Sequence, residues 1–465
     1  MDGLFLVAAA SRTIQSAQSR VHVRTTIGGA SLPLVGMAMM SEGKEASGER
    51  KRIGDYPFDI DYMVYNSSLY ETFLDQKMEK VILNLGLREL PIEVEVFPSP
   101  KKNFRNRARF GVSGSCHDIA ESPEGSNSVR LSELGGTLEQ EPIEFRMWNY
   151  GTASVCVDNF PIACTLINEA MTALRVLLHN DSCHESIAGV RAANFLSTTT
   201  KDCLVVTLIY EKRLDEELWL GEGVKLKLQL EHMLGLSDLS IIARAKKQKL
   251  VLGKGFVTER FHLLDSRVLV YKQVEDGFSN PNGSVNKLSL EWLCSVVGGI
   301  DFREDGVDTD LLEMYCGNGN HTVALSAFVR RVFAVELNKS LCAAANDNLH
   351  ANGISNVNIV CGDSEKFSER ILKAKRYVCK DSSDGSQIEY TFSAVLVDPP
   401  RAGLDEKTRS MVRKYKDIIY ISCNPDALKR DLNELCIDHD IRRFAFFDHF
   451  AYTPHLECGV YLTKR

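Results

Sequence analysis

From about residue 284 to the carboxyl terminus, short apolar runs alternate with helical stretches. Apolar runs separated by helices are typical of parallel strands whose two faces are both covered by those helices. The last two runs have no helix between them, so we expect that pair to be antiparallel. The pattern predicts a doubly wound, Rossmann-like α/β domain that binds its ligands at the carboxyl ends of the strands. The expected strands are 310–315, 332–336, 357–361, 392–398, 418–422, 443–447 and 459–463.

Three of these strands end in groups that can bind a ligand or react. The first runs into the glycine loop Tyr315-Cys316-Gly317-Asn318-Gly319-Asn320, the fourth into Asp398-Pro399-Pro400-Arg401, and the fifth into Ser422-Cys423-Asn424-Pro425. Because the carboxyl ends of parallel strands meet at one edge of the sheet, we expect these groups to surround one crevice.

Cys423 stands where a strand turns into a helix. Pro425 suits the first position of that helix, and the amino end of a helix favours a thiolate. An isolated cysteine is otherwise a small buried hydrophobic residue, which is how we interpret Cys294, Cys342 and Cys436. We therefore predict that Cys423 is a nucleophile.

The glycine loop has the spacing of a nucleoside site. Gly317 and Gly319 allow a tight turn close to a ligand, and Glu336 follows Gly317 by nineteen residues, where a carboxylate can accept hydrogen bonds from ribose hydroxyls. The dinucleotide-binding fingerprint G-x-G-x-x-G is incomplete, because its last position is Thr322, and the sequence contains no P-loop motif. An adenosyl ligand without a pyrophosphate, such as S-adenosyl-L-methionine, therefore fits better. Asp363 is interpreted either as a contact to the adenine amino group or as a helix N-cap.

A cysteine beside a methyl donor suits methylation of a pyrimidine carbon. Carbon 5 of uracil is a poor nucleophile, but a thiolate that adds to carbon 6 turns carbon 5 into an enolate-like nucleophile. A base must then remove the carbon 5 proton; Glu457 is the candidate and His455 the alternative. Asp398-Pro399-Pro400 resembles the turn of nitrogen methyltransferases, although Arg401 replaces the aromatic residue of those enzymes and suits a phosphate or carbonyl better.

Composition excludes several classes of protein. No apolar run approaches the roughly 18 residues of a membrane span. The thirteen cysteines include no Cys-x-x-Cys spacing, so we expect neither a metal site nor a disulfide scaffold, and a reducing compartment. The net charge of −7 means that an RNA-binding surface would be local, with basic candidates at 101–110 and 244–249.

The chain is predicted to have three parts. Residues 1–55 are a disordered or targeting segment, because 1–41 contain arginine, serine, threonine and alanine but a single acid. We expect a cytoplasmic protein, or a mitochondrial or plastid one if 1–41 is a transit peptide. Residues 56–265 predict an α+β RNA-recognition domain with a disordered insertion near 113–141, and 266–465 a methyltransferase domain. The segment 224–230 is left open between strand and helix.

Over roughly residues 56–465 the sequence resembles the tRNA (uracil-5-)-methyltransferase family, which makes the 5-methyluridine of the tRNA T loop. The last three of the matching motifs are, in this order, highly specific. The motifs are Glu144-Phe145-Arg146-Met147-Trp148, Tyr271-Lys272-Gln273-Val274-Glu275, Phe278 with Pro281-Asn282, the glycine loop, Asp398-Pro399-Pro400-Arg401-Ala402-Gly403-Leu404-Asp405, Ser422-Cys423-Asn424-Pro425 and His455-Leu456-Glu457-Cys458-Gly459-Val460.

The resemblance implies roles for individual residues. The family's nucleophile falls on Cys423 and its proton-abstracting base on Glu457, with Asp398 beside them in the catalytic site. The implied S-adenosyl-L-methionine contacts are Gln273, Tyr315, Gly317, Asn320, Glu336 and Asp398.

The resemblance also implies a partner, the T arm of tRNA, bound by a monomer that extrudes the target uridine. Ribosomal RNA is the alternative substrate, but the ribosomal branch carries an amino-terminal β-barrel and a four-cysteine iron–sulfur site, and we expect neither in this chain. An RNA-binding protein without turnover and a nicotinamide-dependent dehydrogenase are the alternatives from other classes. The predicted phosphate contacts are Arg105, Arg107, Arg146 and Lys212.

Overall fold

The computed structural model describes residues 66–87, 92–113, 144–148, 154–179, 189–373, 377–380 and 387–465. The predicted disordered or targeting segment 1–55 lies outside these residues, as does nearly all of the predicted insertion near 113–141. Within the described ranges, no helix is both long and apolar enough to cross a lipid bilayer.

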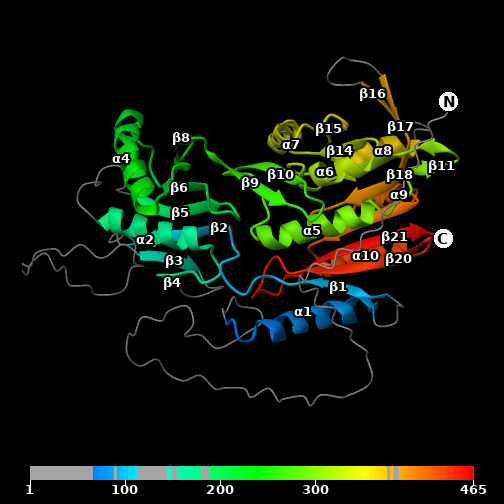
Figure 1. Ribbon diagram of the computed structural model, residues 1–465, viewed down its shortest axis with the longest axis horizontal. Coiled ribbons are helices and arrows are strands. Elements are labelled where there is room, and N and C mark those ends of the chain that lie inside the picture. The colour runs from blue at the N-terminus through cyan, green and yellow to red at the C-terminus, as the bar shows by residue number, and fades with distance from the viewer. Residues whose placement is uncertain are drawn as a thin grey trace, which may run out of the picture. The chain divides into compact units, whose positions relative to one another are not determined.

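The larger sheet follows the predicted plan. Its strands are β1 (Val94–Phe97), β13 (Asp310–Met314), β14 (Val332–Glu336), β15 (Val357–Cys361), β18 (Phe392–Val397), β19 (Asp417–Ser422), β20 (His439–Phe447) and β21 (Glu457–Lys464). They lie in the order β1-β20-β21-β19-β18-β13-β14-β15 (Figure 1). The run from β19 to β15 is parallel throughout, and β21 is antiparallel to both of its neighbours. The doubly wound sheet and the antiparallel last strand are therefore confirmed.

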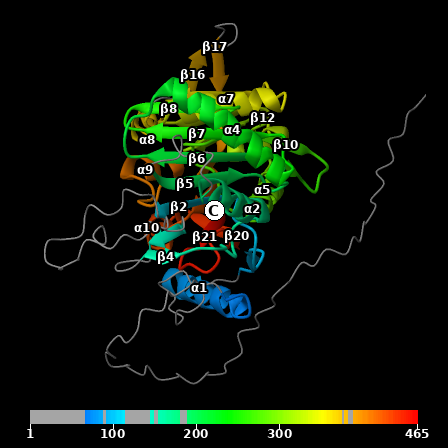
Figure 2. The ribbon, with the colours of Figure 1, turned by 90° about the vertical axis from the view of Figure 1, so that its left-hand side faces the viewer.

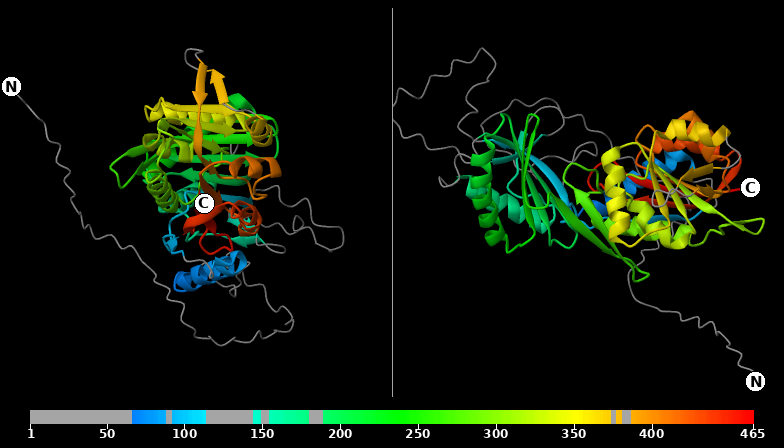
Figure 3. Two further views of the ribbon diagram at one scale, coloured as in Figure 1. Left: turned by 90° about the vertical axis from the view of Figure 1, so that its right-hand side faces the viewer. Right: turned by 90° about the horizontal axis from the view of Figure 1, so that it is seen from above.

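Helices cover both faces of this sheet (Figure 3). Successive residues of a strand point to opposite faces, so each strand contributes side chains to two cores. Leu312 and Met314 of β13 join one core with α8 (Ser364–Lys373), α9 (Glu406–Val412) and α10 (Pro425–Leu435). Leu311 joins the other core with α5 (Gly283–Val297), α6 (Asn320–Leu325) and α7 (Lys339–Ala351). Burial on both faces explains why the central strands are nearly continuous apolar runs.

An early segment of the chain belongs to the same sheet. α1 (Tyr70–Leu85) contacts α10, and β1 pairs in parallel with β20, with Val96 opposite Phe446. Both elements fall in the range 56–265 that the sequence assigns to the RNA-recognition domain, so the predicted boundary does not follow the sheets. A parallel partner more than three hundred residues away leaves no local pattern in the sequence.

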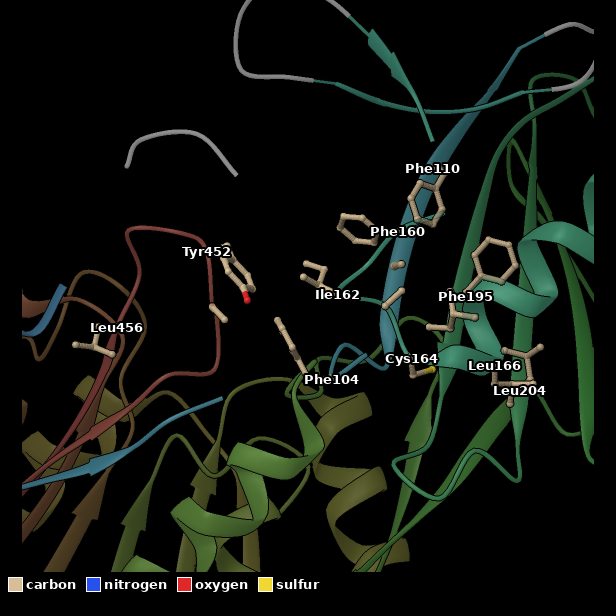
Figure 4. Packing of buried hydrophobic residues seen from close by; sticks show 14 of the residues in the cluster. Phe104, Phe110, Phe160, Ile162, Cys164, Leu166, Phe195, Leu204, Tyr452 and Leu456 are labelled. Atoms are coloured by element: carbon tan, nitrogen blue, oxygen red, sulfur yellow. The ribbon is translucent and has the colours of Figure 1, made fainter. Parts of the chain in front are cut away.

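The smaller sheet has the order β4-β3-β2-β5-β6-β7-β8, with α2 (Thr165–His179) and α4 (Glu216–Leu234) on one side (Figure 2). Phe110 packs its ring 5.6 Å from Phe160 and 6.1 Å from Phe195 in the core of this part (Figure 4). The segment 224–230, which the sequence leaves open, is helical within α4. The strands are β2 (Arg107–Ser113), β3 (Glu144–Trp148), β4 (Ser154–Cys156), β5 (Val190–Ser197), β6 (Leu204–Tyr210), β7 (Leu239–Ala245) and β8 (Gln248–Leu252).

Three hairpins complete the described residues. β9 (Phe256–His262) and β10 (Val268–Val274) connect the smaller sheet to the larger one in the chain, and β10 carries Gln273. The other two are β11 (Arg303–Glu304) with β12 (Val307–Asp308), and β16 (Tyr377–Lys380) with β17 (Gln387–Tyr390).

Candidate active site

The glycine loop joins β13 to α6 through backbone in the left-handed region. Tyr315, Gly317 and Gly319 have φ values of 63°, 58° and 78°. A Cβ atom at Gly317 would meet no atom within 4 Å, whereas one at Gly319 would lie 3.3 Å from the Ala345 side chain. Gly319 therefore allows α6 to begin close to α7, and Gly317 leaves open space in front of the backbone, as a ligand-binding loop requires.

Glu336 holds this loop in place. Its Oε2 accepts the Gly317 N–H at 3.0 Å, and its Oε1 accepts the Asn338 N–H at 2.7 Å. A carboxylate has about four lone-pair positions, so both oxygens can still accept the hydroxyl groups of a ribose. The structure thus brings Gly317 and Glu336 together as their spacing predicts.

The strand β10, which carries Gln273, is tied to the same loop by a residue of α7. The side chain of Asn348 on α7 accepts the Lys272 N–H at 2.8 Å and donates to the Asn318 carbonyl oxygen at 2.9 Å. One amide therefore ties β10 to the glycine loop. Asn348 is a positioning residue that the sequence analysis missed, because nothing in its helix marks it.

Two other predicted ligand contacts are engaged by the protein itself. Asn320 exchanges hydrogen bonds with Asn286 of α5, side chain to side chain, at 2.9 and 3.0 Å. Asp363 accepts the Lys366 N–H at 2.9 Å and so caps α8. The capping interpretation of Asp363 is confirmed.

Cys423 and Glu457 come from neighbouring antiparallel strands. The last pair in the ladder of β19 and β21 joins Ser422 to Cys458. The next residue outward is Cys423, directly after β19, on one side and Glu457, the first residue of β21, on the other, and the charge of Glu457 raises the pKa of the Cys423 thiol. The predicted nucleophile and the predicted base therefore meet at one end of the sheet.

The turn that carries Cys423 is fastened to the turn that carries Asp398. Asn424 caps α10 by accepting the Asp426 N–H at 3.1 Å, and it donates to the Arg401 carbonyl oxygen at 2.8 Å. The two turns follow adjacent parallel strands, β19 and β18. This one side chain holds both together, so Asp398 and Cys423 share a site as predicted.

The expectation that the helix terminus makes Cys423 a thiolate is wrong in direction. Burial raises the pKa of its thiol, and the carboxylates of Glu457 and Asp398 raise it further, while Arg401 acts in the opposite sense. Burial, as the largest cause, and the two negative neighbours together raise the pKa of the thiol above its usual value. At neutral pH the resting group is therefore a thiol.

Glu457 is held by a histidine. Nε2 of His449 lies 2.8 Å from Oε2 of Glu457, and the histidine side chain is only 1% exposed. Burial alone raises the pKa of Glu457, but the neighbouring His449 is the main group that acts against it, and the pKa lies below its usual range. Glu457 is thus ionised at neutral pH, as a base must be.

The second carboxyl group of the site behaves in the opposite way. Burial, and then the charges of Glu457 and Glu313, raise the pKa of Asp398 well above its usual range. Oδ2 of Asp398 lies 4.0 Å from Nδ1 of His321, whose pKa burial lowers to about 4, so the imidazole is neutral and no ion pair forms. Two carboxyl groups with opposed pKa shifts are the pattern of a base beside a proton-holding acid.

Three residues of this cluster were not predicted: Glu313, His321 and His449. Glu313 is buried on β13, and burial raises its pKa to about 8. An acid inside an otherwise apolar strand was a signal that the sequence offered. The two histidines gave none, since the fold alone brings them to Glu457.

Two of the predicted RNA contacts have structural partners. The guanidinium of Arg107 donates to the carbonyl oxygens of Val274, Glu275 and Gly277 at 3.2, 2.9 and 2.6 Å. Nε of Arg105 donates to the Arg107 carbonyl oxygen at 2.8 Å. Burial lowers the pKa of both arginines. Arg107 therefore fixes the segment that follows Gln273.

The other basic positions differ in their surroundings. Arg146 lies 3.3 Å from Glu144, and Lys212 is exposed. In the second basic cluster, Arg244 pairs with Glu275 at 2.6 Å, which reduces the positive charge there. A cavity of about 300 Å³ is lined by residues that include Arg105, Arg107, Arg109, Asn194, Thr207 and Glu275.

Comparison with protein families gives a match over most of the chain. The model of the tRNA (uracil-5-)-methyltransferase family matches residues 116–465. The chain is 37% identical over 399 residues to the tRNA/tmRNA (uracil-C(5))-methyltransferase of Chromohalobacter salexigens, covering 85% of this chain and 96% of that relative. It is 38% identical over 402 residues to the protein of the same name from Photobacterium profundum, covering 86% and 98%.

A solved structure shares the fold. The tRNA (uracil-54, C5)-methyltransferase of Pyrococcus abyssi, in complex with S-adenosyl-L-homocysteine, superposes with a TM-score of 0.57. The superposition covers 85% of this chain and 83% of the other at 21% sequence identity.

Proposed function

Because the chain belongs to the tRNA (uracil-5-)-methyltransferase family, we propose that it methylates carbon 5 of the T-loop uridine of tRNA, conventional position 54, with S-adenosyl-L-methionine as the methyl donor. The observation that carries this proposal is the meeting of Cys423 and Glu457 at the same end of the sheet as the glycine loop. A thiol and an ionised carboxylate are the two groups that carbon 5 methylation through a covalent adduct requires.

The residues around the glycine loop fit an adenosyl ligand. Gly317 borders open space, and the oxygens of Glu336 keep acceptor capacity for ribose hydroxyl groups. When bound, S-adenosyl-L-methionine supplies an electrophilic methyl group on a sulfonium. The residues that would hold it are Gln273, Tyr315, Gly317, Asn320, Glu336 and Asp398.

Cys423 starts the reaction by adding to carbon 6 of the uracil. The electrons of the carbon 5–carbon 6 double bond then move toward carbon 5 and the carbonyl oxygen on carbon 4, which makes carbon 5 nucleophilic. Because burial and two carboxylates raise the pKa of Cys423, its proton must leave as the sulfur–carbon bond forms. Asp398, whose raised pKa makes it a proton-holding acid, can pass its proton to the carbonyl oxygen on carbon 4 as that oxygen gains electrons, and the carboxylate that this leaves can take the proton of the thiol.

Glu457 completes the reaction once carbon 5 is methylated. Its carboxylate takes the carbon 5 proton, and the electrons of that carbon–hydrogen bond restore the carbon 5–carbon 6 double bond. The bond between carbon 6 and the Cys423 sulfur breaks, and its electrons return to the sulfur. A carboxylate that is already ionised at neutral pH suits this step.

Methylation assays with matched RNAs test the proposal. Methyl transfer should occur on tRNA transcripts that contain the T-loop uridine, and not on transcripts without it or on ribosomal RNA fragments. Cys423→Ala should abolish methylation while tRNA still binds, because the nucleophile alone is lost, whereas Cys436→Ala should remain active. Methylation of ribosomal fragments in preference to tRNA, or activity in Cys423→Ala, would contradict the proposal.

A further inference from the structure

We infer that His449 is a positioning residue that donates a hydrogen bond to Glu457 and orients its carboxylate for removal of the carbon 5 proton. This inference rests on the proposed function, because it assigns a role to a residue that acts through the proposed base. His449 follows β20, and its ring nitrogen Nε2 is 2.8 Å from a carboxylate oxygen of Glu457. No motif of the sequence analysis includes it.

The surroundings of the imidazole determine which nitrogen carries its proton. Nδ1 of His449 is buried and has no hydrogen-bond partner among the described residues. A buried N–H group without an acceptor is rarer and more costly than a buried lone pair without a donor, so a neutral ring carries its proton on Nε2, and a protonated ring carries one there as well. Nε2 also lies 3.3 Å from the amide nitrogen of Asn280, but the contact to the carboxylate is shorter and its acceptor is charged. His449 therefore donates to Glu457.

The charges around Glu457 agree with this role. Besides His449, the titratable groups that influence its carboxylate or feel its charge are His321, Asp398, Cys423 and Cys458. His321 is neutral at pH 7, and the cysteines and Asp398 contribute no positive charge. His449 is the neighbour that most favours the ionised form of Glu457, against the effect of burial.

Side chains of α1 hold the loop that carries His449 in place. Asp448 is fully buried and accepts the Tyr70 hydroxyl at 2.8 Å, and it forms a buried ion pair with Lys77. The Lys77 ammonium also donates to the carbonyl oxygens of Phe450 and His455 at 3.3 and 3.2 Å. The backbone on both sides of His449 is therefore held, which orients the imidazole toward Glu457.

A double-label experiment separates proton removal from methyl transfer. A tRNA transcript carries tritium on carbon 5 of its uridines, and the methyl donor carries carbon-14; both labels are followed in a single turnover at several pH values. In the wild-type protein, tritium release should keep pace with methyl transfer. In His449→Leu, methyl transfer should continue into protein-bound RNA, while tritium release slows about tenfold or more, because a hydrogen bond to a charged group is lost.

The pH profile of tritium release distinguishes a positioning role from a purely structural one. Without His449 the pKa of Glu457 rises, so release in His449→Leu should fall off at a higher pH than in the wild type and recover as the pH is raised. His449→Gln keeps an N–H donor and should release tritium at close to the wild-type rate. His350→Leu, which removes an exposed histidine on α7, is the matched control.

The outcomes are distinguishable. A wild-type protein that neither transfers methyl groups to tRNA nor releases tritium would overturn the proposed function itself. If the wild-type protein is active and His449→Leu releases tritium at the same rate and with the same pH profile as the wild type, the role inferred for His449 is wrong. Binding of S-adenosyl-L-homocysteine identifies the variants that fold. If His449→Leu does not fold, His449→Gln is used for the test. A tenfold loss of tritium release in His449→Gln would then overturn the inference.

Discussion

Cys423 shows how far the surroundings of a residue can override its local sequence. It lies at the amino end of α10, where a thiolate is favoured, yet burial and the carboxylates of Glu457 and Asp398 raise the pKa of its thiol. The helix terminus is visible in the sequence, since Asn424 and Pro425 follow directly. The carboxylates come from other strands, so their effect could not be read from the local motif.

The raised pKa of Cys423 predicts slow alkylation near neutral pH. The thiolate is the reactive form, and a pKa above the ordinary value leaves less of it at about pH 7 than in a free cysteine. The rate at which iodoacetamide modifies the peptide containing Cys423 can be followed by mass spectrometry. This rate should therefore keep increasing up to a higher pH than the rate at which iodoacetamide modifies glutathione. A rate that levels off below about pH 7 would contradict this electrostatic description of the site.

At the scale of elements, the parallel strands were predictable and their distant partners were not. β13, β14, β18 and β19 are nearly continuous apolar runs because both faces are buried, and this pattern is local. β1 joins the sheet at its edge, and α1 fixes the loop that carries His449. Neither role has a local signature, because each depends on partners more than three hundred residues away.

The anchoring of that loop by α1 predicts a large effect on stability. Lys77→Met leaves the buried Asp448 carboxylate without its cation, and breaking a buried ion pair in this way costs about 3–5 kcal/mol of the free energy of unfolding. Lys80→Met, an exposed position on the same helix, should cost less than about 0.5 kcal/mol. Urea denaturation of both variants measures the difference. Equal effects would show that the buried pair does not anchor the loop.

At the scale of the whole molecule, the sequence predicted the fold class and the edge of the sheet that carries the chemistry. The order of strand, loop and reactive residue is written along the chain, so Cys423, Asp398 and the glycine loop were found together. The sequence analysis did not predict the contacts that join the smaller sheet to the residues near the ligand site. Arg107 was predicted to contact phosphate, and its guanidinium donates to three backbone carbonyl oxygens at and just after the end of β10.

The position of Arg107 predicts a phenotype that differs from that of a phosphate contact. Arg107→Gln should loosen the segment after Gln273 and weaken binding of S-adenosyl-L-homocysteine, because each lost hydrogen bond to a charged donor is worth about 1.5–3 kcal/mol. Lys212→Gln removes an exposed charge and should leave that binding unchanged. Isothermal titration calorimetry with S-adenosyl-L-homocysteine compares the two variants. Unchanged affinity in Arg107→Gln would restore the phosphate interpretation.

The central claim is that the sulfur of Cys423 bonds to carbon 6 of the target uracil and leaves only after Glu457 has removed the carbon 5 proton. Fluorine in place of that proton cannot be removed by a carboxylate, so the adduct should persist. Wild-type protein incubated with 5-fluorouridine-substituted tRNA and S-adenosyl-L-methionine should yield, by mass spectrometry, a methylated RNA adduct on the peptide that contains Cys423, and Cys423→Ala should yield none. Absence of the adduct from the wild-type protein, or its attachment to another cysteine, would contradict this mechanism.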